Sequence, residues 1–212
     1  MPSSLAAGSR GAYPAGAMEP SPLPPDLETL ARAFRHNGER AAAVCQGLGE
    51  DQGMLAPAAG AWSVAQCLDH LTIVDRAYLR HLEVAAAAPR ARRRPADTSD
   101  VTRPGPLGRW IVRQLEPPPR FGTRLPARRF LRPREHARLA EALSDLLGTH
   151  RLYLDFLAAS RDLDLRGIHL ASPVFRLLRL SAASALAVVL AHERRHLQQA
   201  ERTRERVVGP PA

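Results

Sequence analysis

The chain has 212 residues, of which 45% are hydrophobic. This length and composition suffice to bury one core, so we expect a single domain. The formal net charge of +9 comes from 30 basic residues, all of them arginine. Because the chain has no lysine, a Walker-type phosphate site and a Schiff-base mechanism, which both need an amine, are excluded.

The positive charge has two interpretations. Clustered arginines neutralise phosphates, so the charge is compatible with nucleic-acid binding. Abundant Ala, Arg, Pro and Leu without Lys is also typical of codon bias in a GC-rich genome, and we favour this second interpretation. Aromatic residues make up only 5% of the chain and are scattered, which argues against stacking platforms for single strands. We therefore expect a small-molecule substrate and no nucleic-acid partner.

The N-terminal segment and the cysteines indicate the compartment. Residues 1–22 have the composition of a disordered tail, and Met18 is an alternative translation start. This segment lacks the apolar region of a secretory signal, and two cysteines are too few for a disulfide framework. The longest apolar run, SAASALAVVLA, is about half the length that a membrane helix needs. We expect a cytoplasmic protein without membrane contact.

Two helices are predicted in the first half of the chain. Pro25 suits the first turn of a helix, and apolar residues recur at helical spacing over about 25–47. Ser63 and Gln66 have the spacing of a capping box, which predicts that a second helix begins there. Its apolar stripe continues to about residue 87.

The second half begins with a long connection. Residues 90–133 are rich in Pro, Gly and Arg and include one short helical piece, LGRWIVRQL; this length indicates a lid or an insertion. A third helix is predicted over about 134–160, SPVFRLLRL is expected to add a helical turn, and Ser181 caps a last helix that ends near Arg206. No alternating pattern typical of a strand occurs. The sequence therefore predicts an all-α four-helix bundle over residues 23–208, with a long crossover between helices two and three.

Three histidines have the pattern of a metal site. His192 and His196 lie four residues apart in HERRH, so on a helix their rings emerge about 40° apart and about 6 Å along one face. His70, near the end of WSVAQCLDH, supplies a third imidazole from a neighbouring helix. Three nitrogen ligands with an open position are typical of a catalytic metal site.

Other interpretations of these residues remain open. HERRH also matches the pattern of zinc peptidases, with Glu193 as general base. Such an enzyme needs a third ligand downstream, whereas only sixteen residues follow His196 and the metzincin extension is absent. Cys67 lies one turn before His70 and is either a softer fourth ligand or a small buried residue. The remaining histidines have no partner at ligand spacing, and we expect them in the core or on the surface: His36, His81, His136, His150 and His169.

The two histidine-bearing segments carry a resemblance to a known family. WSVAQCLDHL, followed much later by AHERRHLQQAER, resembles the DinB-like superfamily of four-helix bundles, which includes YfiT-like metal-dependent hydrolases and thiol-dependent S-transferases. The resemblance covers about residues 23–206. It implies that His70, His192 and His196 bind a divalent ion, nickel, zinc or iron, and it matches Gln199 to the trailing Gln of the family.

The resemblance and the histidine pattern together imply a metal-dependent S-transferase or hydrolase. The ion would lower the pKa of a water or of a substrate thiol. Gln199, Glu193 and Asp69 are candidates for orienting the ligand imidazoles. Arg92, Arg93 and Arg94 are candidates for binding an anionic group of the substrate. The alternative is a non-enzymatic protein whose Arg-rich crossover contacts nucleic acid or an acidic partner; a homodimer stays open.

Overall fold

The computed structural model describes residues 22–88, 91–95, 100–117, 129–175 and 177–208. The expectations for the tail at residues 1–22 and for Met18 concern residues outside this set, apart from residue 22. No helix in the described ranges is long and apolar enough to cross a membrane.

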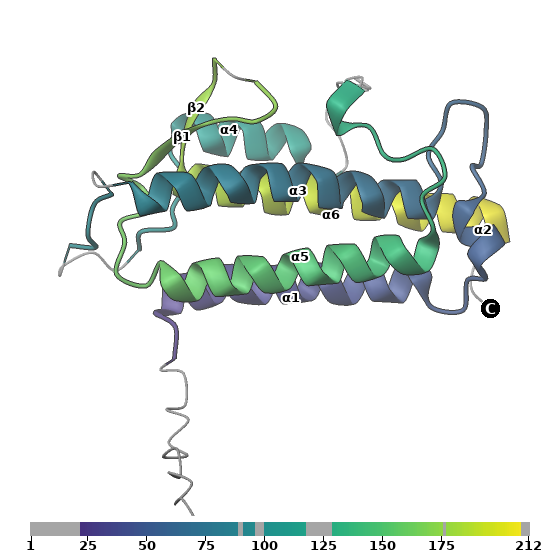
Figure 1. The fold of residues 1–212 in the computed structure, drawn as a ribbon, viewed down its shortest axis with the longest axis horizontal. Coiled ribbons are helices and arrows are strands. Elements are labelled where there is room, and N and C mark those ends of the chain that lie inside the picture. The colour runs from purple at the N-terminus through teal and green to yellow at the C-terminus, as the bar shows by residue number, and fades with distance from the viewer. Residues whose placement is uncertain (1–21, 89–90, 96–99, 118–128, 176, 209–212) are drawn as a thin grey trace, which may run out of the picture.

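Four long helices form a bundle. They are α1 (Pro25–Cys45), α3 (Val64–Ala87), α5 (Leu139–Ala159) and α6 (Ala182–Val208). Helix α3 packs against α5 and α6, and α1 packs against the same two helices, so the four enclose one interior (Figure 1). The predicted helical bundle is confirmed.

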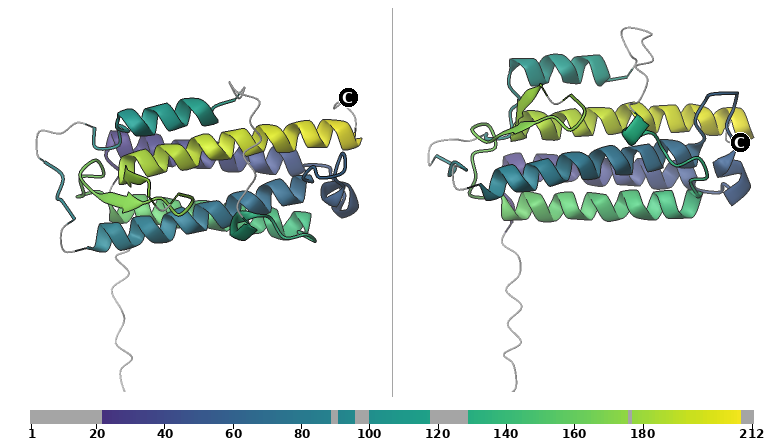
Figure 2. Two further views of the ribbon diagram at one scale, coloured as in Figure 1. Left: turned by 90° about the horizontal axis from the view of Figure 1, so that it is seen from above. Right: turned by 45° about the horizontal axis from the view of Figure 1, so that its top comes forward.

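The long crossover follows from the directions of the helices. Helices α3 and α5 run the same way, so the chain has to return along the whole bundle between them (Figure 1). Helix α4 (Pro106–Leu115) makes much of this return on the outer side of α6 (Figure 2), and the short 3-10 helix η1 (Arg129–Leu131) follows before α5. The crossover is therefore part of the fold, with α4 as an additional packed helix.

Helix α3 begins where the sequence predicts. Ser63 Oγ accepts a hydrogen bond from the Gln66 backbone N–H at 3.1 Å, and Gln66 Oε1 accepts one from the Ser63 N–H at 3.1 Å. This reciprocal capping box fixes the first turn of α3. It thereby also fixes the direction in which His70 points, about two turns later.

The start of α5 differs from the prediction. The helix begins at Leu139, later than the expected residue 134. Its start is set by a capping side chain that is remote in sequence. The carboxylate of Glu50, in the short helix α2 (Glu50–Met54), accepts hydrogen bonds from the N–H groups of Leu139 at 2.7 Å and Ala140 at 3.3 Å. Helix α2 itself was not predicted.

The connection between α5 and α6 corrects two expectations. Strands β1 (His169–Ala171) and β2 (Arg179–Ser181) pair antiparallel. The described residues of SPVFRLLRL therefore lie in the connection between the strands and in β2, and the predicted helical turn and the absence of strands were wrong. Leu170 and Leu180 face the core, while their neighbours along the strands are more exposed. Three residues are too few for this alternation to be recognised in a sequence.

Candidate metal centre

The structure brings the three histidines together. His70 comes from α3, and His192 and His196 come from α6. The ring centroids are 5.2 Å apart for His70 and His192, 4.7 Å for His70 and His196, and 4.6 Å for the two on α6. One nitrogen of each ring lies within 4.8 Å of the others. Nitrogens at about 2.1 Å from one tetrahedral ion are about 3.4 Å apart, so small ring rotations suffice.

Hydrogen bonds select the nitrogen that two of these rings offer. His70 Nδ1 lies 2.6 Å from the Leu131 carbonyl oxygen, and His196 Nδ1 lies 3.0 Å from Gln199 Oε1. Both partners are acceptors, so each Nδ1 carries the hydrogen and each Nε2 keeps its lone pair for an ion. His192 Nδ1 is buried without a hydrogen-bond partner in the described chain. The residues present fit a divalent ion that prefers imidazole, such as zinc, nickel or iron.

Burial keeps the three imidazoles neutral. It is the largest cause that lowers the pKa of His70, and it lowers the pKa of His192 well below its usual range, with His196 and His70 adding to the effect. Burial, followed by the neighbouring His70, lowers the pKa of His196 to about 3. Neutral imidazole is the form that binds metals, so no proton has to be displaced near pH 7.

Trp62 lies against the cluster. Its ring centroid is 4.7 Å from that of His70 and 5.7 Å from that of His196. The sequence predicts only that Trp62 packs beneath the start of the second helix. Trp62 directly precedes Ser63, the N-cap of α3. The capped start of the helix therefore also holds the indole beside two candidate ligands.

The three candidates for orienting the imidazoles have different surroundings. Gln199 hydrogen-bonds to His196, as described above. Asp69 accepts hydrogen bonds from Arg134, from the backbone N–H at 2.7 Å and from Nε at 2.9 Å, and so holds the segment before α5. Glu193 is fully buried in the bundle interior, where it contacts other side chains. Of these three side chains, only Gln199 forms a hydrogen bond to one of the clustered histidines within the described ranges. The Leu131 carbonyl, which bonds to His70, is a backbone group and left no signal in the sequence.

Cys67 has the features of a buried core residue. It is fully buried, and burial raises the pKa of its thiol to about 12. It does not belong to the group of side chains within ligand distance of one another. A thiol that stays protonated is a poor metal ligand.

The three arginines 92–94 do not converge. Arg94 forms an ion pair with Asp26 at 3.0 Å, and Arg93 makes a backbone bridge with Leu163. Arg92 lines a cavity, and Arg93 and Arg94 are not part of its lining.

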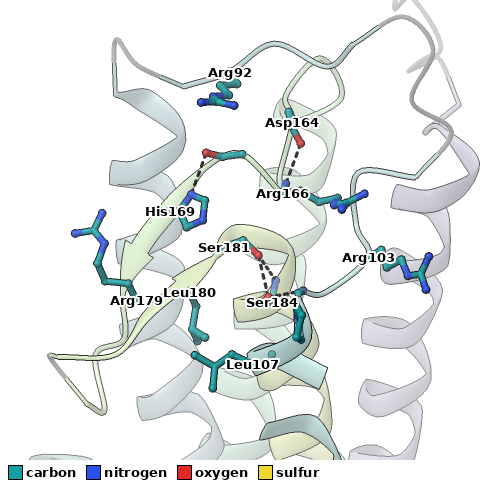
Figure 3. Close-up of a pocket in the computed structure, with 14 residues that line it drawn as sticks. Arg92, Arg103, Leu107, Asp164, Arg166, His169, Arg179, Leu180, Ser181 and Ser184 are labelled. Carbon is teal, nitrogen blue, oxygen red and sulfur yellow. Dashed lines mark hydrogen bonds between the residues drawn. The ribbon is translucent and has the colours of Figure 1, made fainter. Parts of the chain in front are cut away.

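This cavity of about 580 Å³ lies beside the hairpin and the first turn of α6. Figure 3 shows Arg92, Arg166 and Arg179 around it, on separate segments of the chain. Ser184 also lines it, and His192 follows eight residues later, about 12 Å along the helix axis. The arginine-lined cavity and the histidine cluster are therefore separate places on the molecule.

Comparison with known proteins supports the resemblance inferred from the sequence. The family model of the DinB superfamily matches residues 33–200, which include most of the bundle and all three clustered histidines. Searches of curated proteins and of solved structures found no significant match. Because the family model matches well over half of this chain, the chain belongs to the DinB superfamily.

Proposed function

We propose that the protein is a metal-dependent enzyme acting on a small molecule, as a thiol S-transferase or a hydrolase. The observation that carries the proposal is the convergence of three neutral imidazoles, His70, His192 and His196, within ligand distance of one another. A divalent ion, nickel, zinc or iron, would supply Lewis acidity that lowers the pKa of a water or thiol beside it.

The surrounding residues hold and orient the imidazoles. The Leu131 carbonyl and Gln199 fix the proton on Nδ1 of two rings and thereby their orientation. His192 and His196 each keep part of their surface exposed, so the cluster is not fully enclosed. Trp62 offers a flat apolar wall against which a substrate packs.

Of the two reactions we favour thiol transfer. Hydrolysis usually needs a general base near the water, but Asp69 is engaged by Arg134 and Glu193 faces the interior. A thiol has an ordinary pKa of about 8.5, so a modest lowering makes it a thiolate at neutral pH without a base.

Metal analysis tests the proposal. The wild type, purified without chelator and loaded with nickel, zinc, iron or manganese in turn, should bind an ion at the histidines. His70→Ala and His196→Ala should lose that ion and keep the helical circular dichroism signal, and the control His36→Ala, an exposed residue of α1, should keep both. A wild type that binds none of the four metals above background contradicts the proposal.

A second candidate function is binding of nucleic acid or an acidic partner. The observation that favours it is the cavity lined by Arg92, Arg166 and Arg179, none of which forms an ion pair within the described ranges. Tight duplex binding at physiological salt that survives His192→Ala and is lost when Arg92 and Arg179 are replaced would favour this function over the enzyme.

We also propose a cytoplasmic location. Cys45 and Cys67 are both free thiols, as is usual in a reducing compartment.

A further inference from the structure

A second polar cluster lies in the bundle interior. Each of the four long helices contributes one side chain: Asn37 from α1, Asp75 from α3, His150 from α5 and Glu193 from α6. None is more than 5% exposed, and Asp75 and Glu193 are fully buried. Polar side chains that meet from facing helices are the way in which helical bundles build metal sites.

The hydrogen bonds of this cluster are incomplete. Glu193 Oε2 accepts a hydrogen bond from Asn37 Nδ2 at 2.6 Å, and Glu193 Oε1 lies 3.1 Å from His150 Nε2. Neither carboxylate oxygen of Asp75 accepts a hydrogen bond from an N–H or hydroxyl donor in the described chain, and the group within hydrogen-bonding reach of it is the Glu193 carboxylate. Two carboxylates offer only acceptors to each other, so a positive species has to lie between them.

Among the described residues, no arginine forms an ion pair with either of these two carboxylates. In the described ranges Asp75 forms no ion pair, and the only one of Glu193 is with His150. Burial, and then the neighbouring Glu193, raise the pKa of Asp75 well above its usual range, so a shared proton is one solution. A single proton neutralises only one of the two carboxylates, whereas a divalent cation compensates the negative charge of both.

The distances within the cluster suit a cation. One ligand atom each of Asp75, His150 and Glu193 lies within 4.8 Å of the others. The 3.1 Å between His150 Nε2 and Glu193 Oε1 matches the roughly 3 Å that separates neighbouring ligands of an octahedral ion with bonds of about 2.1 Å. A Cβ at Gly38 would lie 3.0 Å from His150 Nδ1, so the glycine gives the ring its room.

We propose that Asp75, His150 and Glu193 bind a divalent cation in the bundle interior. Two carboxylates and one imidazole form a more oxygen-rich set than three histidines, and suit manganese or ferrous iron. Successive residues of a helix point about 100° apart, so Glu193 and the preceding His192 face different sides of α6 and the two sites are separate. The interior ion would join α3, α5 and α6, and it enters during folding because its ligands are buried.

Refolding in the presence of Mn²⁺ tests this site alone. The His70→Ala/His196→Ala variant is unfolded in guanidinium, refolded with Mn²⁺ and dialysed. It should retain one Mn²⁺ per chain and melt at a higher temperature than the same variant refolded without metal. Adding Asp75→Asn should abolish both effects, because Asn keeps the shape of a protonated Asp and removes the charge. Adding Glu205→Gln, at an exposed carboxylate of the same helix, is the matched control and should change neither.

Either of two results of the refolding experiment would overturn the proposal. One is a His70→Ala/His196→Ala variant that retains no Mn²⁺ after refolding, and the other is retention that Asp75→Asn leaves unchanged. If the Asp75→Asn variant does not fold, X-ray absorption of the Mn²⁺-loaded double variant decides the matter. A shell of carboxylate oxygens with one imidazole supports the site, and a shell without imidazole overturns it.

Discussion

At the scale of single residues, the position of one proton decides whether an imidazole can bind an ion. Gln199 lies one turn after His196 and accepts from its Nδ1, so Nε2 is left as the ligand atom. The Leu131 carbonyl does the same for His70 from a different segment of the chain. Both contacts also limit ring rotation, which reduces the entropy lost when an ion binds.

We expect Gln199→Ala to weaken metal binding without unfolding the protein. Loss of such an outer hydrogen bond typically lowers metal affinity by about 10- to 100-fold. The measurement is isothermal titration calorimetry with Zn²⁺ on the metal-free protein. Gln198→Ala, the neighbouring amide, is the matched control and should bind as the wild type does. Equal affinity for both variants would mean that Gln199 does not orient His196.

Residue patterns predicted the histidine cluster in part. The spacing of His192 and His196 on one helix is visible in the sequence, and His70, on a second predicted helix, was the third candidate, which the resemblance then supported. The contacts of His150 with Glu193, and of His70 with a carbonyl, join residues that are 43 and 61 positions apart. No local spacing encodes such pairs, so the sequence placed His150 among residues without a partner.

At the scale of elements, the close contact between α4 and α6 depends on a glycine. A Cβ at Gly108 would lie 2.5 Å from Ser184 Oγ and 2.6 Å from Ser184 Cβ. Gly108→Ala should therefore push α4 away from α6 and destabilise the protein by about 1–3 kcal/mol, the usual cost of overpacking.

The control for this change is Gly148→Ala in the interior of α5, where a Cβ would meet nothing within 4 Å. Alanine there should stabilise by about 0.5–1 kcal/mol, because it restricts the unfolded chain and favours the helix. Urea unfolding measures both free energies. A Gly108→Ala variant as stable as the wild type would show that α4 does not pack on α6 in this way.

Elements with many periodic residues were predicted well, and short ones were not. The four long helices repeat their apolar positions over several turns, which separates them from loops. Helix α2 spans a single turn, and each strand of the hairpin has three residues, so neither repeats a pattern. The start of α5 depends on Glu50, which is remote in sequence.

At the scale of the whole molecule, the histidine cluster links stability to pH. Folding brings together three imidazoles whose pKa values are lower in the folded than in the unfolded chain. Protonation of any of them favours unfolding, whereas a bound ion favours the folded state. The metal-free protein should therefore be sensitive to mild acid, and the loaded protein less so.

We expect the metal-free protein to lose stability as the pH falls from about 6.5, the usual pKa of an unfolded histidine. In the folded chain the pKa of His196 is about 3, so between these values the unfolded chain binds more protons and the free energy of unfolding decreases. The stability that neutral His196 retains for the folded chain is fully present above pH 6.5 and is lost as the pH falls toward 3. The pKa of Asp75 is shifted upward, which has the opposite effect on stability, so the informative quantity is a difference between variants.

Urea unfolding at several pH values measures this difference. The free energy of unfolding should decrease less for His196→Gln than for the wild type, and for His36→Ala it should decrease as much as for the wild type. Equal decreases for wild type and His196→Gln would show that His196 titrates as an ordinary histidine, and the ion would then dissociate near pH 6 instead of at lower pH.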